Sequence, residues 1–331
     1  MAQAVLSVYD HITQNNRKTL LLVLLFPISL CVLITLACWL AVVLVGDTQM
    51  VADGVSLLPD TWQPQTPNKF FAGLGFAYDF LLPTAVIGII WIIVSYLFGS
   101  KMMLSFAGAT PIEKKDAKQL YNAVENTAIM AGLPMPKLYI MEDKSLNAFA
   151  TGANPKSASI AVTRGLMEKL SPMELQGVIA HEMAHIGNRD IRLNMLIVSG
   201  LGIFYSLGRS CLRSASRSSS RNDKKNGQGA VLMLCIGIAL LVFNFVVAPL
   251  LQMAVSRQRE YAADATGAKI LHNPKALADA LEKIAVDARV EVLDNQKNMA
   301  VACIASPFAS LSSLTSTHPP IDERIRRLRN M

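Results

Sequence analysis

The sequence predicts a mainly α-helical fold with a small β-sheet, in which a multi-span membrane anchor carries a soluble domain. Hydrophobic residues make up 52% of the 331 residues, and they gather in long runs without charge. Between these runs lies a stretch with helical periodicity and two short segments rich in β-branched and aromatic residues. Such a contrast is typical of a chain whose parts face different solvents.

Two of the uncharged runs are long enough to cross a bilayer, since each exceeds about 20 residues. The first is also longer than the apolar region of a cleaved secretory signal. Basic residues stand before the first run and after the second, at Arg17, Lys18 and Lys101, so the positive-inside rule favours a cytoplasmic location for both flanks. We expect a cytoplasmic N-terminus, a transmembrane span, a periplasmic loop and a second span at 1–18, 19–46, 47–79 and 80–100.

Residues 101–192 have the pattern of the first part of a soluble domain. The segment at 116–133 has apolar residues at helical spacing, and "PKLYIMED" at 136–143 and "SASIAVTRG" at 157–165 are typical of strands. The next segment, "SPMELQGVIAHEMAHIG" at 171–187, begins with a serine, a proline and, three residues after the serine, a glutamate. This is a capping box, so we expect a helix that ends near Gly187.

The string "AHEMAHI" stands within that helix and suggests a metal site. Because residues i and i+4 share one face, His181 and His185 can bind one ion through imidazole nitrogens, as zinc prefers. Glu182 is turned about 100° around the axis and can act as the general base for a water held by that zinc. The alternative is a pair of core histidines, but a shuffled chain of this composition gives only about 0.002 such matches.

A catalytic zinc needs a third protein ligand, and "RQREYAADATGAKIL" at 257–271 offers one. Glu260 and Asp264 are four residues apart on an expected helix. Glu260 would complete a His, His, Glu set, and Asp264 would hydrogen-bond the far nitrogen of a ligating histidine. The alternative is a solvated helix on which Arg257 and Arg259 pair with the two acids. The pattern alone does not choose between these interpretations.

Between the two motifs lies an apolar hairpin, 193–256, with a basic loop at 209–229. Its first arm, Leu193–Gly208, is short for a span. If both arms cross, the basic loop is periplasmic and breaks the positive-inside rule; if neither crosses, the loop stays near anionic headgroups. Either way the number of crossings is even, so residues 257–331 share a compartment with 101–192 and complete the same domain.

The chain resembles the HtpX-type membrane zinc metallopeptidases, bacterial relatives of the CAAX prenyl proteases. The motifs that carry this resemblance are "LNAFATG" at 146–152, "VIAHEMAHIGNRD" at 178–190, "RQREYAADATGA" at 257–268 and "STHPPIDERIRRL" at 316–328. The resemblance implies a protein of the bacterial inner membrane. Its thermolysin-like (gluzincin) peptidase domain would lie on the cytoplasmic side. It also implies one Zn²⁺ and a role in quality control of misfolded membrane and cytoplasmic proteins.

The same resemblance assigns roles to single residues. It implies zinc ligands His181, His185 and Glu260, a general base at Glu182 and an orienting carboxylate at Asp264. His318 and Arg324 would lie on the transition-state and substrate side, and Asn147 would mark the edge along which a peptide binds. From the residues alone, His318 is more simply a turn residue before two prolines, and Arg324 could as easily be one of several basic residues that suit the end of a helix.

Two functions from different classes follow. The first is a membrane-anchored zinc endopeptidase that acts on unfolded proteins; the second is a non-catalytic metal-binding scaffold or transporter component that uses the same ligands. Glu182 favours the first, because a structural or transport site has no need of a base. The net charge of +7 does not indicate nucleic-acid binding, because the basic residues stand beside apolar spans and at the C-terminus without interleaved aromatics.

Overall fold

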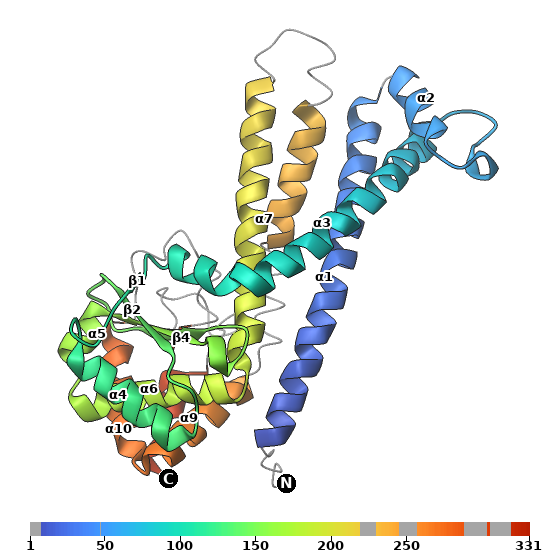
Figure 1. The fold of residues 1–331 in the computed structure, drawn as a ribbon. Helices are drawn as coiled ribbons and strands as arrows, with labels where there is room; N and C mark the ends of the chain where they lie inside the picture. The colour runs from blue at the N-terminus through green and yellow to red at the C-terminus, as the bar shows by residue number, and fades with distance from the viewer. Residues whose placement is uncertain (1–7, 47, 219–229, 245–256, 288–302, 305–318) are drawn as a thin grey trace. The chain divides into compact units, whose positions relative to one another are not determined.

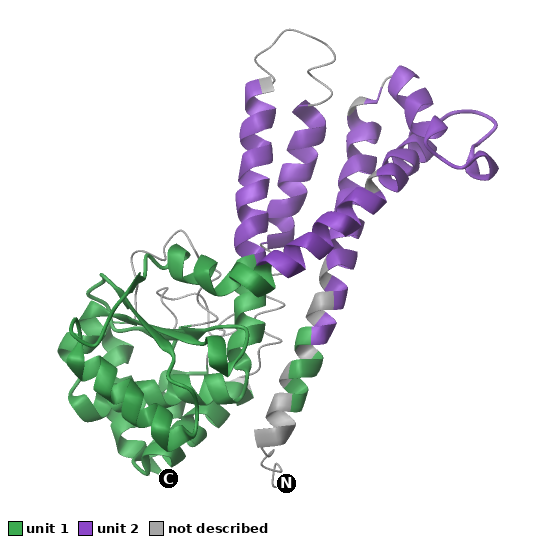
Figure 2. Ribbon diagram, viewed as in Figure 1, with its two compact units in different colours: residues 1–19, 95–199, 249–331 green, residues 20–94, 200–248 purple. Residues whose placement is uncertain are grey.

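The computed structural model describes residues 8–46, 48–218, 230–244, 257–287, 303–304 and 319–331. Most of these are helical and one small sheet accompanies them, as the sequence predicts (Figure 1). The chain forms two compact units (Figure 2). Unit 1 comprises residues 1–19, 95–199 and 249–331, and unit 2 comprises 20–94 and 200–248.

Unit 2 is made of long apolar helices. It contains most of α1 (Val8–Val45), α2 (Thr48–Ser56), the 3₁₀ turn η1 (Asp60–Trp62), most of α3 (Lys69–Phe106), the second half of α7 (Asp190–Ser218) and a helix at Ala230–Asn244. Among the described residues, α1, α3 and α7 are long and apolar enough to cross a membrane. Large apolar side chains on them are exposed, such as Leu82 at 72%, which suits lipid contact better than water. Of the two expected spans, 80–100 lies within α3, and 19–46 ends one residue beyond α1.

Two helices extend beyond their predicted ends. α3 begins at Lys69 instead of 80, because residues 70–79 carry a single charge, Asp79, and one charge marks no helix end. α7 continues to Ser218, so the prediction of a basic loop is wrong over 209–218, where arginines stand four apart on a helix. Arginine is a good helix former, and a charge that ends a membrane run does not end a helix. Residues 219–229 of the expected loop lie outside the described residues.

The sheet belongs to unit 1 and has the strand order β1–β2–β4–β3. Its strands are β1 (Thr110–Pro111), β2 (Lys137–Met141), β3 (Ala148–Thr151) and β4 (Ser159–Thr163). β2 and β4 lie in the two segments predicted as strands and pair in parallel. β3 pairs antiparallel with β4, with Ala148 opposite Val162, and forms one edge of the sheet.

The helices of unit 1 supply the core. They are α4 (Lys118–Ala131), α5 (Arg164–Lys169), α6 (Pro172–Gly187), α9 (Arg257–Leu271), α10 (Pro274–Val286) and α11 (Ile321–Arg329), with a 3₁₀ turn η2 (Pro155–Ser157). α4, α6, α9 and α10 lie on one side of the sheet (Figure 1). Buried apolar residues of α6, such as Val178 and Met183, join one cluster with Ile160 of β4 and Leu281 of α10. α6 is therefore a central helix of this unit.

α9 approaches α6 closely because a glycine stands at the contact. A Cβ on Gly267 would lie 3.0 Å from the backbone nitrogen of His181 and 3.1 Å from the carbonyl carbon of Ala180. Ala263 and Ala268 of α9 are buried as well. Small side chains thus let two helix backbones meet where the two sequence motifs stand.

Replacing Gly267 with valine should destabilise unit 1. The added carbons would push α9 away from His181, and overpacking of this kind costs about 1–3 kcal/mol. Urea unfolding of the full-length chain in detergent measures this effect. Ala265→Val is the matched control, since Ala265 is exposed on the same helix. Equal stability of the two variants would contradict the close contact.

Candidate metal centre

The motif helix α6 begins as the sequence predicts. Ser171 Oγ accepts a hydrogen bond from the Glu174 amide, and Glu174 Oε2 accepts one at 2.7 Å from the Ser171 amide. Pro172 takes the first helical position, where its missing N–H leaves no partner unsatisfied. The helix runs to Gly187 and is buried over nearly all of its second half, including His181 and His185.

Three donor groups from α6 and α9 converge inside unit 1. The Nε2 atoms of His181 and His185 are 3.1 Å apart. Glu260 places Oε2 3.7 Å from His181 Nε2 and Oε1 3.7 Å from His185 Nε2. Glu260 is 5% exposed and Asp264 2%, so the interpretation of a solvated helix over 257–271 is wrong.

The donor set fits a zinc ion. Zinc–ligand bonds of about 2.0–2.2 Å in a tetrahedron set neighbouring donors roughly 3.3–3.6 Å apart. The observed distances between the three donor groups, 3.1 and 3.7 Å, bracket this range. The imidazole rings are nearly perpendicular, at 89°, and turn their Nε2 edges toward each other. Two imidazoles and one carboxylate are also a donor set that zinc uses in catalytic sites.

His181 is held on its other side by a carboxylate and an arginine. Its Nδ1 lies 2.9 Å from Asp264 Oδ1, as expected for a residue that orients a ligand. Arg324 of α11 donates to both oxygens of Asp264, through Nε at 2.9 Å and a terminal nitrogen at 2.8 Å. Burial opposes ionisation of Asp264, but Arg324 outweighs it and lowers the pKa of that carboxyl to about 2. Asp264 therefore stays ionised.

Arg324 itself is fully buried, unlike the other arginines of its helix. Its side chain is 1% exposed, whereas that of Arg326 is 65% exposed. It also donates to the Ile304 carbonyl at 2.8 Å and lies 3.9 Å from Glu260 Oε2. Arg324 is therefore not one of the exposed basic residues at the end of this helix, and that interpretation is wrong.

Replacing Arg324 with methionine should strongly destabilise the chain. Removing one member of a buried ion pair leaves the other uncompensated and costs about 3–5 kcal/mol. The free energy of unfolding in urea measures the loss. Arg326→Met, an exposed change on the same helix, should cost no more than about 0.5 kcal/mol. A loss below about 1 kcal/mol in the Arg324 variant would contradict a compensating role.

His185 has its own carboxylate, which the sequence prediction missed. Asp190 Oδ2, at the start of α7, lies 2.7 Å from His185 Nδ1. Arg259 is 5% exposed and stands 3.7 Å from Asp190 Oδ1, instead of pairing with acids on its own helix. The one signal in the sequence was an acid shortly after the second histidine, in "HIGNRD", since ligand histidines commonly donate to a carboxylate.

Glu182 stands beside the donors without being one of them. Its carboxyl is 1% exposed and accepts a hydrogen bond from the backbone amide of Ala150 in β3. Burial raises the pKa of Glu182 to about 7, with His185 opposing and Glu260 adding to the rise. Its Oε1 makes no hydrogen bond to any residue that the structure describes. Such a group can exchange a proton near neutral pH.

The outer edge of β3 lies next to Glu182. Asn147 is buried and its side-chain oxygen accepts from the Ala148 amide at 3.0 Å. The Ala148 carbonyl accepts from the Ile304 amide at 2.9 Å, and Phe149 forms an antiparallel bridge with Cys303. The expected peptide-binding edge is therefore paired with the chain itself at this point.

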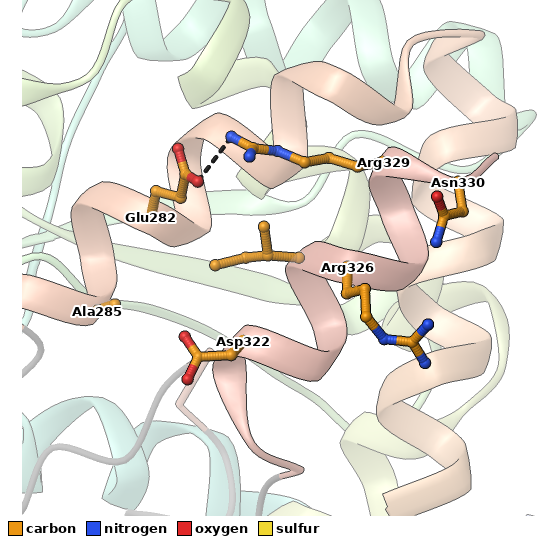
Figure 3. Close-up of a pocket in the computed structure, with 7 residues that line it drawn as sticks. Glu282, Ala285, Asp322, Arg326, Arg329 and Asn330 are labelled. Atoms are coloured by element: carbon orange, nitrogen blue, oxygen red, sulfur yellow. Dashed lines mark ion pairs between the residues drawn. The ribbon is translucent and has the colours of Figure 1, made fainter.

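His318 lies outside the described residues, so its expected role stays a prediction. A pocket between α10 and α11 contains none of the metal donors (Figure 3), and Arg329 in its wall lies 2.6 Å from Glu282. Within the described residues of unit 1, the candidate catalytic site is therefore the group of His181, His185 and Glu260 with Glu182 beside them.

Comparisons with known proteins identify the family of this chain. Residues 114–331 match the model of peptidase family M48. A protease HtpX homologue from Bacteroides fragilis is 38% identical over 327 residues, which cover 95% of each chain. Another from Syntrophobacter fumaroxidans is 41% identical over 253 residues, 74% of this chain and 88% of that protein.

Among solved structures, Ste24p of S. mikatae matches with a TM-score of 0.42 and 20% identity, covering 85% of this chain and 62% of that one. The residues matched by the family model include the three donors and Glu182. The chain therefore belongs to peptidase family M48, among relatives named as HtpX proteases.

Proposed function

We propose that this chain is a membrane-anchored zinc endopeptidase whose active site faces the cytoplasm. The observation that carries the proposal is the position of Glu182, buried beside the His181, His185 and Glu260 donors but not among them. A scaffold or transport site would need the donors alone. Membership of a peptidase family supports the same conclusion.

The proposed metal is zinc, held by His181, His185 and Glu260. When bound, zinc supplies Lewis acidity and a water whose pKa is lowered to near 7. Asp264 fixes the tautomer of His181 by accepting its Nδ1 proton, so that Nε2 faces the ion. Histidine nitrogens and a carboxylate oxygen suit zinc better than magnesium or calcium, which prefer oxygen alone.

Glu182 performs the proton chemistry in this proposal. Its carboxylate accepts a proton from the water that attacks the peptide carbonyl. It later donates that proton to the leaving amine. The Ala150 amide holds one side of the carboxyl group, which leaves Oε1 for the exchange. A pKa of about 7 suits both steps, because the group can take up and release a proton at neutral pH.

Arg324 is proposed to stabilise negative charge as it develops at the reacting carbonyl. A terminal nitrogen of its guanidinium lies 3.5 Å from the ring nitrogens of His181, so its positive charge stands at the site even while it binds Asp264. Fixed charge of this kind acts on the transition state more than on the ground state. His318 is proposed as a second donor there, and Asn147 as a residue that shapes the peptide edge.

The substrates are proposed to be unfolded or misfolded proteins of the membrane and cytoplasm. An extended peptide can pair with the outer edge of β3, where main-chain hydrogen bonds give affinity without sequence preference. Because Cys303 and Ile304 pair with Phe149 and Ala148, and the Ala150 amide binds Glu182, we expect the peptide to pair with the edge beyond that amide, next to Glu182. Binding of this kind requires a locally unfolded chain.

Replacing Glu182 with glutamine should abolish peptide hydrolysis while zinc stays bound. The amide keeps the shape of the side chain but cannot accept the proton, so we expect a fall in kcat of at least about 100-fold. Full-length protein is compared with and without zinc on unfolded casein, and the metal content of each sample is measured.

Removal of zinc with a chelator should abolish wild-type cleavage, and added zinc should restore it. Glu174→Gln, on the same helix but outside the site, is the control for handling. Equal cleavage by wild type and the Glu182 variant would sink the mechanism. Zinc binding without cleavage in wild type would favour the scaffold or transporter function instead.

The orientation is proposed from the charge of the flanking residues. With the soluble domain in the cytoplasm, a fluorescent protein fused after Met331 should fluoresce and alkaline phosphatase fused there should be inactive. The same reporters inserted at Gln65, an exposed position between η1 and α3, should give the opposite pattern. Phosphatase activity at the C-terminus would overturn the proposed orientation.

A further inference from the structure

We propose that Asp190 and Arg259 form a second positioning pair. The pair orients His185 and fixes the first turn of α9, which carries Glu260, to the start of α7. The proposal rests on the proposed function, in which His181, His185 and Glu260 hold zinc. It adds two residues to the machinery of the site, neither of which is itself a metal donor.

The first step is the bond between His185 and Asp190. Asp190 Oδ2 lies 2.7 Å from His185 Nδ1, and the carboxylate is 1% exposed. Because Nδ1 is engaged there, the opposite nitrogen, Nε2, faces His181 and Glu260. A carboxylate at this position fixes the tautomer and orientation of the ring and raises the basicity of the ligand nitrogen.

The second step is the charge that compensates Asp190. A buried carboxylate is costly unless a cation stands beside it. Arg259 is 5% exposed, and one terminal nitrogen lies 3.7 Å from Asp190 Oδ1 while the other donates to Asn194 Oδ1 at 3.1 Å. Arg259 therefore lies against two residues of the first turns of α7 at once.

The third step is the position of Arg259 in the chain, directly before Glu260. Because Arg259 is held against α7, the backbone of the next residue, Glu260, is restrained. The Glu260 carboxylate is therefore held in position beside the two histidines. Asp190 follows His185 by five residues in the sequence. The pair thus holds both His185 and Glu260 against the start of α7.

The arrangement repeats the one around the other histidine. His181 donates to Asp264, which Arg324 compensates, and His185 donates to Asp190, which Arg259 stands beside. Each imidazole then has its own carboxylate and its own guanidinium. The two arrangements differ in the source of the arginine, which comes from α11 in the first and from α9 in the second.

The test measures zinc affinity in the full-length chain in detergent, by competition with a chromogenic chelator. Asp190→Asn should weaken zinc binding about 10- to 100-fold, the range seen when such outer partners are removed. Arg259→Met should weaken it as well, and Arg259→Lys should recover part of the loss. The double variant should lose little more than Asp190→Asn alone, because the two residues act as one unit.

Matched controls come from an exposed ion pair of the same unit. Glu142→Gln and Arg164→Met break the pair between those two residues, and each should bind zinc within twofold of wild type. Cobalt substitution adds a spectroscopic readout. The visible absorption band of the cobalt form should change shape in Asp190→Asn and stay unchanged in the controls, since ligand orientation sets that band.

The outcomes separate this proposal from the proposed function. Wild-type protein that binds no zinc would overturn both. Tight binding by wild type together with equally tight binding by Asp190→Asn, and the same cobalt spectrum, would overturn the positioning pair alone. If Asp190→Asn does not fold, Arg259→Met decides: unchanged zinc affinity there would mean that the pair only supports the fold.

Discussion

The site depends on one contact, the close packing of α9 against α6. His181 and His185 are fixed by their spacing on a single helix, but Glu260 comes from a helix that begins some seventy residues later in the chain. It reaches both histidines at 3.7 Å because the two helix backbones meet at Gly267. A larger residue in place of Gly267 would move Glu260 away from the two histidines, even though all three donors were unchanged.

That contact buries several charges, and their compensation shapes the surroundings. Glu182, Glu260, Asp190 and Asp264 are each 5% exposed or less. In a medium of low polarity such groups must be paired or neutral. Arginine compensates two of them and burial raises the pKa of Glu182 toward neutrality. The same physics that makes the cluster costly to fold thus leaves a group able to exchange protons.

Local patterns made α6 predictable: the capping box, the proline and the four-residue spacing each act within a few residues. Long-range pairing was not predictable in the same way. Arg259 has acids beside it in sequence, yet it pairs with Asp190, because Glu260 and Asp264 are turned toward the histidines. The end of α7 was also misjudged, since charge marks where an apolar run stops and not where the helix stops.

The start of α7 links the two requirements of a membrane peptidase. Asp190 and Asn194, in its first turns, contact His185 and Arg259, and the same helix continues through Ser218 as a candidate span. If the helix crosses the membrane, the orientation of His185 is set by a residue at the end of a transmembrane segment. Sequence change within that span is then constrained at its first turns by the candidate metal site and beyond them by lipid.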